Sequence, residues 1–336
     1  MFAALVATLI VAAWPVASSP HPQVRNSLVK QSDPDLYRAI NRRTAAGEPY
    51  YPVTADELRK GGYPLKPFVT FRPPTLALLL AAFPPLATTI APGLLALALL
   101  IVWWRRLEPE LPLLLLAFML VLVVGGSAAL VGPVTRLFHE TWAALLLALM
   151  VGLRRPGHAA AAILVGAIAL AVRETVLPMI LVMGGLALVE RRWKEASGWA
   201  AVVALFILAM FVHAGMVASV VRADDLASPG WNAMLGARFA LDALARVSSA
   251  TMLPTAVAAP VLILSLFGWL SVATGSALRT SLLLFGYGAM LALFARADTF
   301  YWALLAAPLS LAGLVFVPRA ITTLVHASRS MAQRNI

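Results

Sequence analysis

The chain has 336 residues, of which 61% are hydrophobic and only 12% are charged. Soluble domains carry about 45–50% apolar and about 25% charged residues, so the composition argues against a soluble protein and predicts an all-α polytopic membrane protein. The absence of cysteine excludes disulfides and thiolate metal sites. The formal net charge of +11 points to lipid headgroups and anionic phosphorylated ligands rather than nucleic acid, because most arginines flank apolar segments or lie in one loop.

The apolar segments predict about ten transmembrane helices, since a span needs roughly 20 apolar residues. In chain order they are 2–18, 87–104, 111–131, 141–153, 158–173, 175–190, 197–221, 251–272, 281–296 and 300–317. The three segments from 141 to 190 are short for a full crossing. The alternative for the first segment is a cleaved signal peptide, because "VASS" suits cleavage, although no Lys or Arg precedes the apolar run.

A long first loop, residues 19–86, has helical content of its own. Pro34 suits the first turn of a helix with Asp33 as its cap. The residues that share one face at helical spacing are Asp33, Leu36, Tyr37 and Ile40. A second short helix is expected in "TADELRKGG", with Thr54 as its cap and Glu57 at the capping-box position. Both are expected to lie in the membrane interface, as is the apolar helix that stops before "PP" at 84–85.

The charges of the short loops predict the orientation. Placing both termini in the cytoplasm puts the arginine-rich segments "WWRRLEPE", "LRRPGH" and "ERRWKEA" inside, as the positive-inside rule requires. The long loop and most carboxylates then lie on the outer face, where any chemistry is expected. No phosphate loop of the GxxxxGK[ST] kind occurs, which argues against a cytosolic nucleotide-driven machine.

The order of motifs after the first span carries a resemblance. It runs from Asp33, Tyr37 and Ala39 through "GEPYY" to "RPP" at 72–74 and an apolar surface helix. This order resembles the GT-C superfamily of integral-membrane glycosyltransferases, in particular small bacterial members that take a sugar from a polyprenyl-phosphate carrier. The resemblance implies a catalytic core over 1–200, made of the first span, the outer loop and the following spans. Residues 201–336 would be C-terminal transmembrane helices, without the soluble domain of many larger members.

The resemblance also implies the catalytic residues. It assigns Asp33 as general base, with Asp35 as the local competitor. An acceptor hydroxyl or amine loses a proton as it attacks the anomeric carbon, and a carboxylate can accept that proton. The alternative is that Asp33 only caps a helix. Glu140 matches by position a second acid that these enzymes carry, and its alternative role is to stabilise a helix N-terminus.

Five further residues are expected to bind substrate. Arg72 and Arg173 suit the phosphate of the donor, where negative charge grows on the leaving oxygen; the alternative for each is a side chain that extends to the membrane surface. Tyr37 and Tyr51 are expected to contact the sugar or the acceptor, with an interfacial aromatic belt as the alternative. His139 either tunes the neighbouring carboxylate or ligates a metal.

The need for a divalent cation stays open, because no HExxH or comparable metal pattern occurs. Asp224 and Asp225 form a carboxylate pair, for which a solvated loop is the favoured interpretation. His213 is expected to be a core histidine with satisfied hydrogen bonds. Arg296 and Asp298 in the last outer loop form a weaker second candidate site.

Together these features predict a glycosyltransferase of a bacterial inner membrane with its active site on the periplasmic face. Its partners would be the polyprenyl-phosphate-linked sugar donor, a lipid or glycan acceptor and membrane lipids, with no nucleic acid. Two alternatives stay open: a transporter or flippase for lipid-linked sugars, and a non-catalytic subunit that keeps the GT-C scaffold. Nothing in the sequence selects the sugar, the acceptor, the stereochemical outcome or the oligomeric state.

Overall fold

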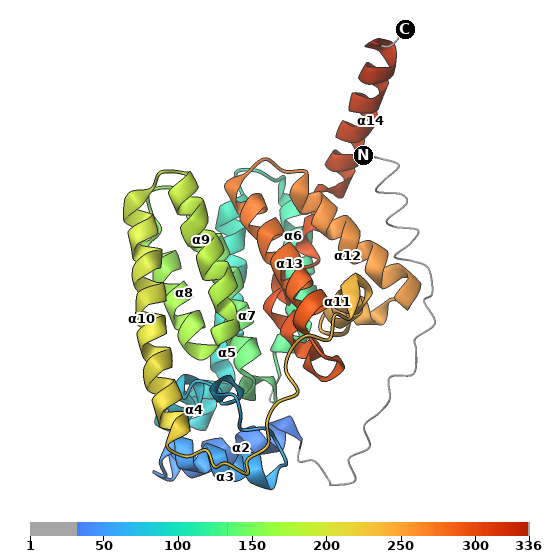
Figure 1. Cartoon of the computed structure of the whole chain (residues 1–336). Helices are drawn as coiled ribbons and strands as arrows, with labels where there is room; N and C mark the ends of the chain where they lie inside the picture. Colours follow the sequence, from blue (N-terminus) through green and yellow to red (C-terminus); the bar gives the residue numbers. More distant parts are fainter. Residues whose placement is uncertain (1–31, 133, 335–336) are drawn as a thin grey trace.

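Long apolar runs form the helices of a bundle (Figure 1). The computed structural model describes residues 32–132 and 134–334, and within these ranges it contains no β-strand. Five segments are long and apolar enough to cross a membrane: Pro85–Leu107, Leu113–Leu130, Trp193–Ala218, Gly275–Phe294 and Ala307–Val325. In the labels of Figure 1 these contain α5 (Pro85–Leu107), α6 (Leu113–Ser127), α10 (Trp193–Ala218), α13 (Gly275–Phe294) and part of α14 (Val317–Arg334). The architecture is that of an all-α membrane protein.

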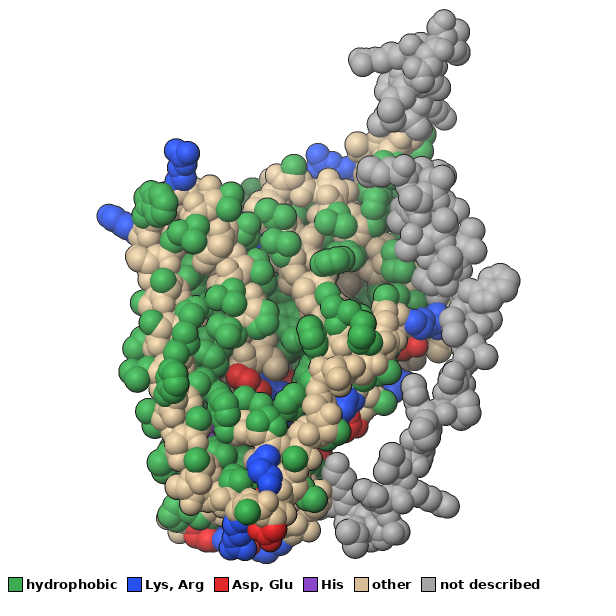
Figure 2. All heavy atoms as spheres, viewed as in Figure 1, with side chains coloured by type: hydrophobic (Ala, Val, Ile, Leu, Met, Phe, Trp, Pro, Cys, Tyr) green, Lys and Arg blue, Asp and Glu red, His purple; other side chains and the backbone are tan. Residues whose placement is uncertain are grey.

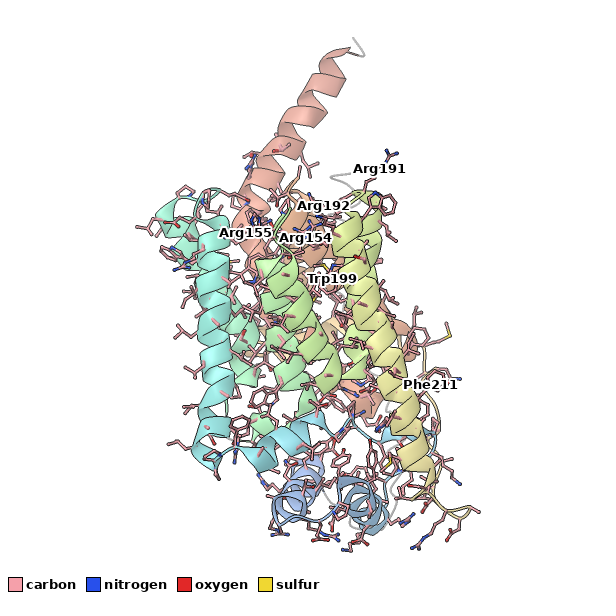
Figure 3. The ribbon with its side chains drawn as sticks, turned by 90° about the vertical axis from the view of Figure 1, so that its left-hand side faces the viewer. Arg154, Arg155, Arg191, Arg192, Trp199 and Phe211 are labelled. Carbon is pink, nitrogen blue, oxygen red and sulfur yellow. The ribbon has the colours of Figure 1, made fainter. Side chains whose placement is uncertain are left out.

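The remaining apolar helices are shorter. They are α7 (His139–Leu153), α8 (Ala160–Val172), α9 (Leu177–Val189) and α12 (Thr255–Leu270). The sequence predicts short helices between 141 and 190, and α7 to α9 agree with this. The segment 2–18, the first of about ten predicted spans, lies outside the described residues. Outward-facing apolar side chains such as Phe211, 73% exposed, suit contact with lipid (Figure 3).

The span predicted at 300–317 is not a regular α-helix, and the candidate span in this region is Ala307–Val325. This stretch folds as three short 3-10 helices, η6 (Ala297–Leu305), η7 (Ala307–Leu309) and η8 (Ala312–Phe316). Pro308 cannot donate a backbone hydrogen bond, and its ring excludes a regular α-helical turn before it. A further helix, α11 (Gly236–Arg246), lies between the spans predicted at 197–221 and 251–272 and packs on α13.

Three short helices form a layer at one end of the bundle: α2 (Asp33–Ala45), α3 (Tyr50–Lys60) and α4 (Thr75–Ala82) (Figure 1). Leu36 and Ile40 of α2 are buried with Val53 of α3, as expected for amphipathic helices. The predicted start of the second helix is wrong. Extended backbone at Pro49 (φ −62°, ψ 132°) lets α3 begin at Tyr50, so Thr54 lies inside the helix and cannot cap it.

Four arginines mark one end of the bundle. Arg154, Arg155, Arg191 and Arg192 lie at the end opposite to α2 and α3 (Figure 3). The loops that the sequence assigns to opposite sides of a membrane therefore lie at opposite ends of the fold. Which end faces the cytoplasm stays a prediction.

The crossing of α12 and η8 depends on two glycines. A Cβ added to Gly268 would lie 1.9 Å from the carbonyl oxygen of Gly313, and one added to Gly313 would lie 2.0 Å from that of Ser265. Because the obstacle is backbone, it cannot move without displacing a helix. We expect Gly268→Ala to destabilise the protein by about 1–3 kcal/mol, measured as a lower midpoint of thermal unfolding in detergent.

Gly286→Ala is the matched control, since a Cβ there meets no atom within 4 Å. It should be neutral or stabilise α13 by about 0.5–1 kcal/mol, because alanine is a better helix former than glycine. Equal unfolding midpoints for the two variants would contradict the assignment of Gly268 to a close backbone crossing.

Candidate functional site

A cavity of about 420 Å³ lies between α2 and the neighbouring ends of the bundle helices. We call it the α2 cavity. Its lining includes polar and aromatic side chains, among them Asp33, Tyr37, Tyr63, Arg72, His139, Arg173, Glu174, Trp231, Tyr301 and Trp302. They come from segments that are far apart in the chain. Of the eight predicted site residues, five line the cavity and Asp35, Tyr51 and Glu140 do not.

Asp33 is the first residue of α2, and Ser32 occupies the cap position before it. Leu36 and Ile40 are buried and line the cavity, so the face of α2 that carries them is turned toward it. Asp33 and Tyr37 share that face because they are four residues apart. Asp33 makes no side-chain cap; its Oδ1 instead accepts a 2.6 Å hydrogen bond from the Tyr63 hydroxyl. The alternative that Asp33 only caps the helix is therefore wrong.

Asp35 points to solvent. Its carboxylate accepts hydrogen bonds from the Ser32 hydroxyl at 2.5 Å and from Arg38 at 2.6 Å. The Ser32 hydrogen bond, with that of Arg38, lowers the pKa of Asp35. The two carboxylates of "DPD" thus lie in different environments, and only Asp33 reaches the cavity.

Arg173 and Glu140 form a buried ion pair, with Nε 2.8 Å from Oε1 and each side chain only 1% exposed. Arg173 also pairs through Nη1 with Glu174. Glu140 lies in the first turn of α7 and does not line the cavity, whereas its partner Arg173 does. Its observed role is to hold the Arg173 guanidinium in place.

Arg72 is the more accessible cation, with 18% of its side chain exposed. Its Nη1 lies 3.7 Å from Glu174 and its Nη2 donates to the Tyr301 hydroxyl at 3.3 Å. The Tyr50 hydroxyl donates to the Arg72 carbonyl at 2.9 Å, which anchors the turn into α4. Arg72 therefore presents a positioned but incompletely neutralised charge to the cavity.

His139 is buried, with 4% of its surface exposed, and lines the cavity. Neither ring nitrogen has a hydrogen-bond partner within residues 32–132 and 134–334. The Tyr37 ring lies 5.5 Å from the His139 ring, between centroids, and burial raises the pKa of the Tyr37 phenol. Both side chains can therefore offer hydrogen bonds to a ligand. In the described part of the chain, no three His, Cys, Asp or Glu side chains form a group that could hold a metal.

Several aromatic residues of the cavity are not among the eight predicted site residues, Tyr301 and Trp302 among them. From the sequence, "DTFYW" at 298–302 is expected to belong to the interfacial aromatic belt, whereas Tyr301 and Trp302 of η6 line the cavity wall. Trp302 is buried, and its Nε1 has no partner in the described residues. The neighbouring weaker candidates, Arg296 and Asp298, also line the cavity. No local signal distinguishes these aromatics from an interfacial belt.

Tyr51 and His213 form a separate packing contact. The Tyr51 hydroxyl lies 3.1 Å from Nδ1 of His213, and Nε2 of His213 lies 3.3 Å from the Phe71 carbonyl oxygen. This agrees with the expectation of a satisfied core histidine. The contact joins α3 to α10, so Tyr51 supports the layer of short helices rather than the cavity wall.

Asp225 ties α3 to the loop after α10. Arg59 donates to both of its carboxylate oxygens at 2.7 Å, and the backbone N–H of Arg222 donates at 2.7 Å. These partners account for Asp225 without a cation. The Arg59 hydrogen bonds lower the pKa of Asp225 to about 2.

The stabilisation that the Arg59–Asp225 ion pair gives to the loop should depend on pH. Because the folded pKa of Asp225 lies below its ordinary 3.8, the stabilisation is complete above pH ~4 and is lost as pH falls through about 2. We expect hydrogen exchange of the amides of 220–228, corrected for intrinsic rates, to lose protection in that window. Asp225→Asn should show low protection at every pH. If the amides of 220–228 stayed protected at every pH in both the wild type and Asp225→Asn, the Arg59–Asp225 ion pair would not be what holds this loop.

Comparison with known proteins adds no assignment: no family model, curated protein or solved structure matches the chain. The chemical argument therefore rests on the α2 cavity. It combines the half-buried carboxylate of Asp33, the partly exposed guanidinium of Arg72, polar atoms without a partner in the described residues, and aromatic walls. Such a site can accept a proton, bind a phosphate oxygen and stack on an apolar sugar face.

Proposed function

We propose that the protein is a membrane glycosyltransferase that takes a sugar from a polyprenyl-phosphate carrier. The observation that carries the proposal is that Asp33 and Arg72 face one cavity with aromatic walls. Asp33 would accept the proton of the attacking hydroxyl or amine as the bond to the anomeric carbon forms. The bond that breaks joins that carbon to the phosphate oxygen of the carrier.

Arg72 would bind the departing phosphate, because its guanidinium is more exposed than that of Arg173 and its contact with Glu174 is long, at 3.7 Å. A preformed positive charge stabilises the growing charge on the leaving oxygen without reorganisation. Arg173 has two carboxylate partners and is 1% exposed. It would support Arg72 and Glu174 in position rather than bind the phosphate directly.

A lipid-linked donor needs to enter from the side. Figure 2 shows acidic and basic side chains in a hollow of the otherwise apolar flank of the bundle, above the layer of short helices. A polyprenyl chain could lie along this flank with its phosphate in the hollow. Tyr301 and Trp302 in the wall suit stacking on the sugar.

The proposal includes the finer topology. About ten spans would place both termini in the cytoplasm of a bacterium and the α2 cavity at the periplasmic face of its inner membrane. The acceptor would be a lipid or a glycan. The charge pattern of the loops supports this orientation, since the arginine-rich loops lie at the end opposite to the cavity.

The direct test incubates the purified protein in detergent with a panel of radiolabelled polyprenyl-phosphate sugars and a membrane extract as acceptor. We expect label to move from one donor to an acceptor. A transporter would leave every donor chemically unchanged in detergent but move it across vesicles. A scaffold subunit would do neither, and either result would refute the proposed reaction.

A further inference from the structure

A second cavity, of about 360 Å³, lies at the turn between α12 and α13, near the arginine-rich end. We call it the α12–α13 cavity. Its lining includes Thr274, Gly275, Ser281, Leu270 and Leu278. It shares no lining residue with the α2 cavity, and the proposed transfer reaction uses none of its side chains.

Arg279 lies directly behind this cavity. Gly275 lines the cavity, and a Cβ added to it would be 3.1 Å from Nη1 and 3.2 Å from Nη2 of Arg279, so the guanidinium lies directly against the Gly275 wall. Arg279 is 1% exposed, yet its Nε and Nη1 have no hydrogen-bond partner among the residues that the structure describes. Leaving two nitrogens of a buried guanidinium without acceptors is unfavourable unless a ligand supplies them.

The nearby carboxylates do not neutralise Arg279. Glu190 and Glu195 act on it electrostatically, but both are bonded to Arg154, at 2.5 and 2.7 Å. Arg106 and Arg154 add positive charge to the same region, and Nε of Arg106 is also without a partner in the described chain. The region therefore carries an excess of positive charge.

The walls of the cavity suit an amphiphile. Ser281 is buried, lines the cavity and has an Oγ without a partner in the described part of the chain. The N-terminus of α13, from the cap residue Thr274 to Gly275, lines the same cavity, and helix N-termini favour anions, although the N–H of Ala277 already donates to the Thr274 hydroxyl. Beside these polar groups, Leu270 and Leu278 are 64% and 48% exposed on the outside of the bundle, where an acyl chain would lie.

We propose that the α12–α13 cavity binds the phosphate of an anionic phospholipid, with the acyl chains lying over Leu270 and Leu278. Arg279 neutralises the phosphate across Gly275, and the first turn of α13 and Ser281 supply hydrogen bonds. Basic pockets between transmembrane helices are suited to anionic headgroups in this way. The site is independent of the proposed glycosyl transfer.

The test compares binding of phosphatidylglycerol and phosphatidylcholine to the delipidated protein in uncharged detergent, by native mass spectrometry. The wild-type protein should retain phosphatidylglycerol in preference to phosphatidylcholine. Arg279→Gln should raise the Kd for it by at least about tenfold, the loss expected for one charge-assisted guanidinium–phosphate contact. Arg191→Gln removes the same charge from a side chain that points away from the bundle (Figure 3) and should bind like wild type.

Gly275→Leu provides a second variant, which fills the cavity and keeps the charge of Arg279. It should also lose the preference, so the test holds even if Arg279→Gln does not fold. Equal retention of phosphatidylcholine, or unchanged binding in both cavity variants, would overturn the proposal. Inorganic phosphate that displaces the lipid and raises the unfolding midpoint by itself to the same extent would overturn the lipid assignment in favour of a free anion.

Discussion

Replacing Asp33 with asparagine should reduce sugar transfer by about 10²–10⁴-fold, the usual contribution of a general base. The substitution keeps the size of the side chain and leaves an oxygen to accept the Tyr63 hydrogen bond, which is 2.6 Å long in the wild type. The fold should therefore persist. The measurement is initial rate of transfer at saturating donor, with thermal unfolding recorded on the same preparation.

Asp35→Asn is the control for this prediction, because it makes the same chemical change two residues away on an exposed side chain. It should retain the wild-type rate. Transfer that survives in Asp33→Asn would remove Asp33 from the mechanism. Loss in Asp35→Asn alone would move the base to the carboxylate that the structure places in solvent.

Glu140→Gln should destabilise the protein by about 3–5 kcal/mol, because it leaves part of the charge of a buried guanidinium uncompensated. Arg173 and Glu140 are each 1% exposed and 2.8 Å apart, so water cannot replace the missing carboxylate. The measurement is the midpoint of thermal unfolding in detergent, converted to a free energy where unfolding is reversible.

A double-mutant cycle separates the ion pair from other effects of the substitution. Glu140→Gln combined with Arg173→Met should be less unstable than the sum of the two single variants, because the double variant leaves neither charge unpaired. The exposed pair of Asp35 and Arg38, with side chains 56% and 52% exposed, supplies the contrast: Asp35→Asn should cost at most about 1 kcal/mol. An additive cycle would show that Glu140 and Arg173 do not depend on one another.

Local hydropathy predicted much of the bundle. The segments predicted at 87–104, 158–173 and 175–190 correspond to α5, α8 and α9, because an apolar run of sufficient length forms a helix whatever surrounds it. At 300–317 the same criterion did not anticipate the short 3-10 turns, which Pro308 and the close approach of Gly313 to α12 favour. The candidate span there is Ala307–Val325. It also overlooked α11, which is short and carries charged residues.

The sequence by itself determined the class of the protein and the end of the bundle at which polar groups gather, because composition, hydropathy and loop charge are local properties. Only the tertiary structure decided which polar side chains meet. Asp33 and Tyr63 are 30 residues apart, and Glu140 and Arg173 are 33 apart. Helical spacing puts Asp33 on the face of Leu36 and Ile40 and Asp35 off it, but only the burial of that face shows that the first carboxylate lines the α2 cavity and the second lies in solvent. Partner choice of this kind depends on how helices pack, which is a property of the whole chain rather than of any segment.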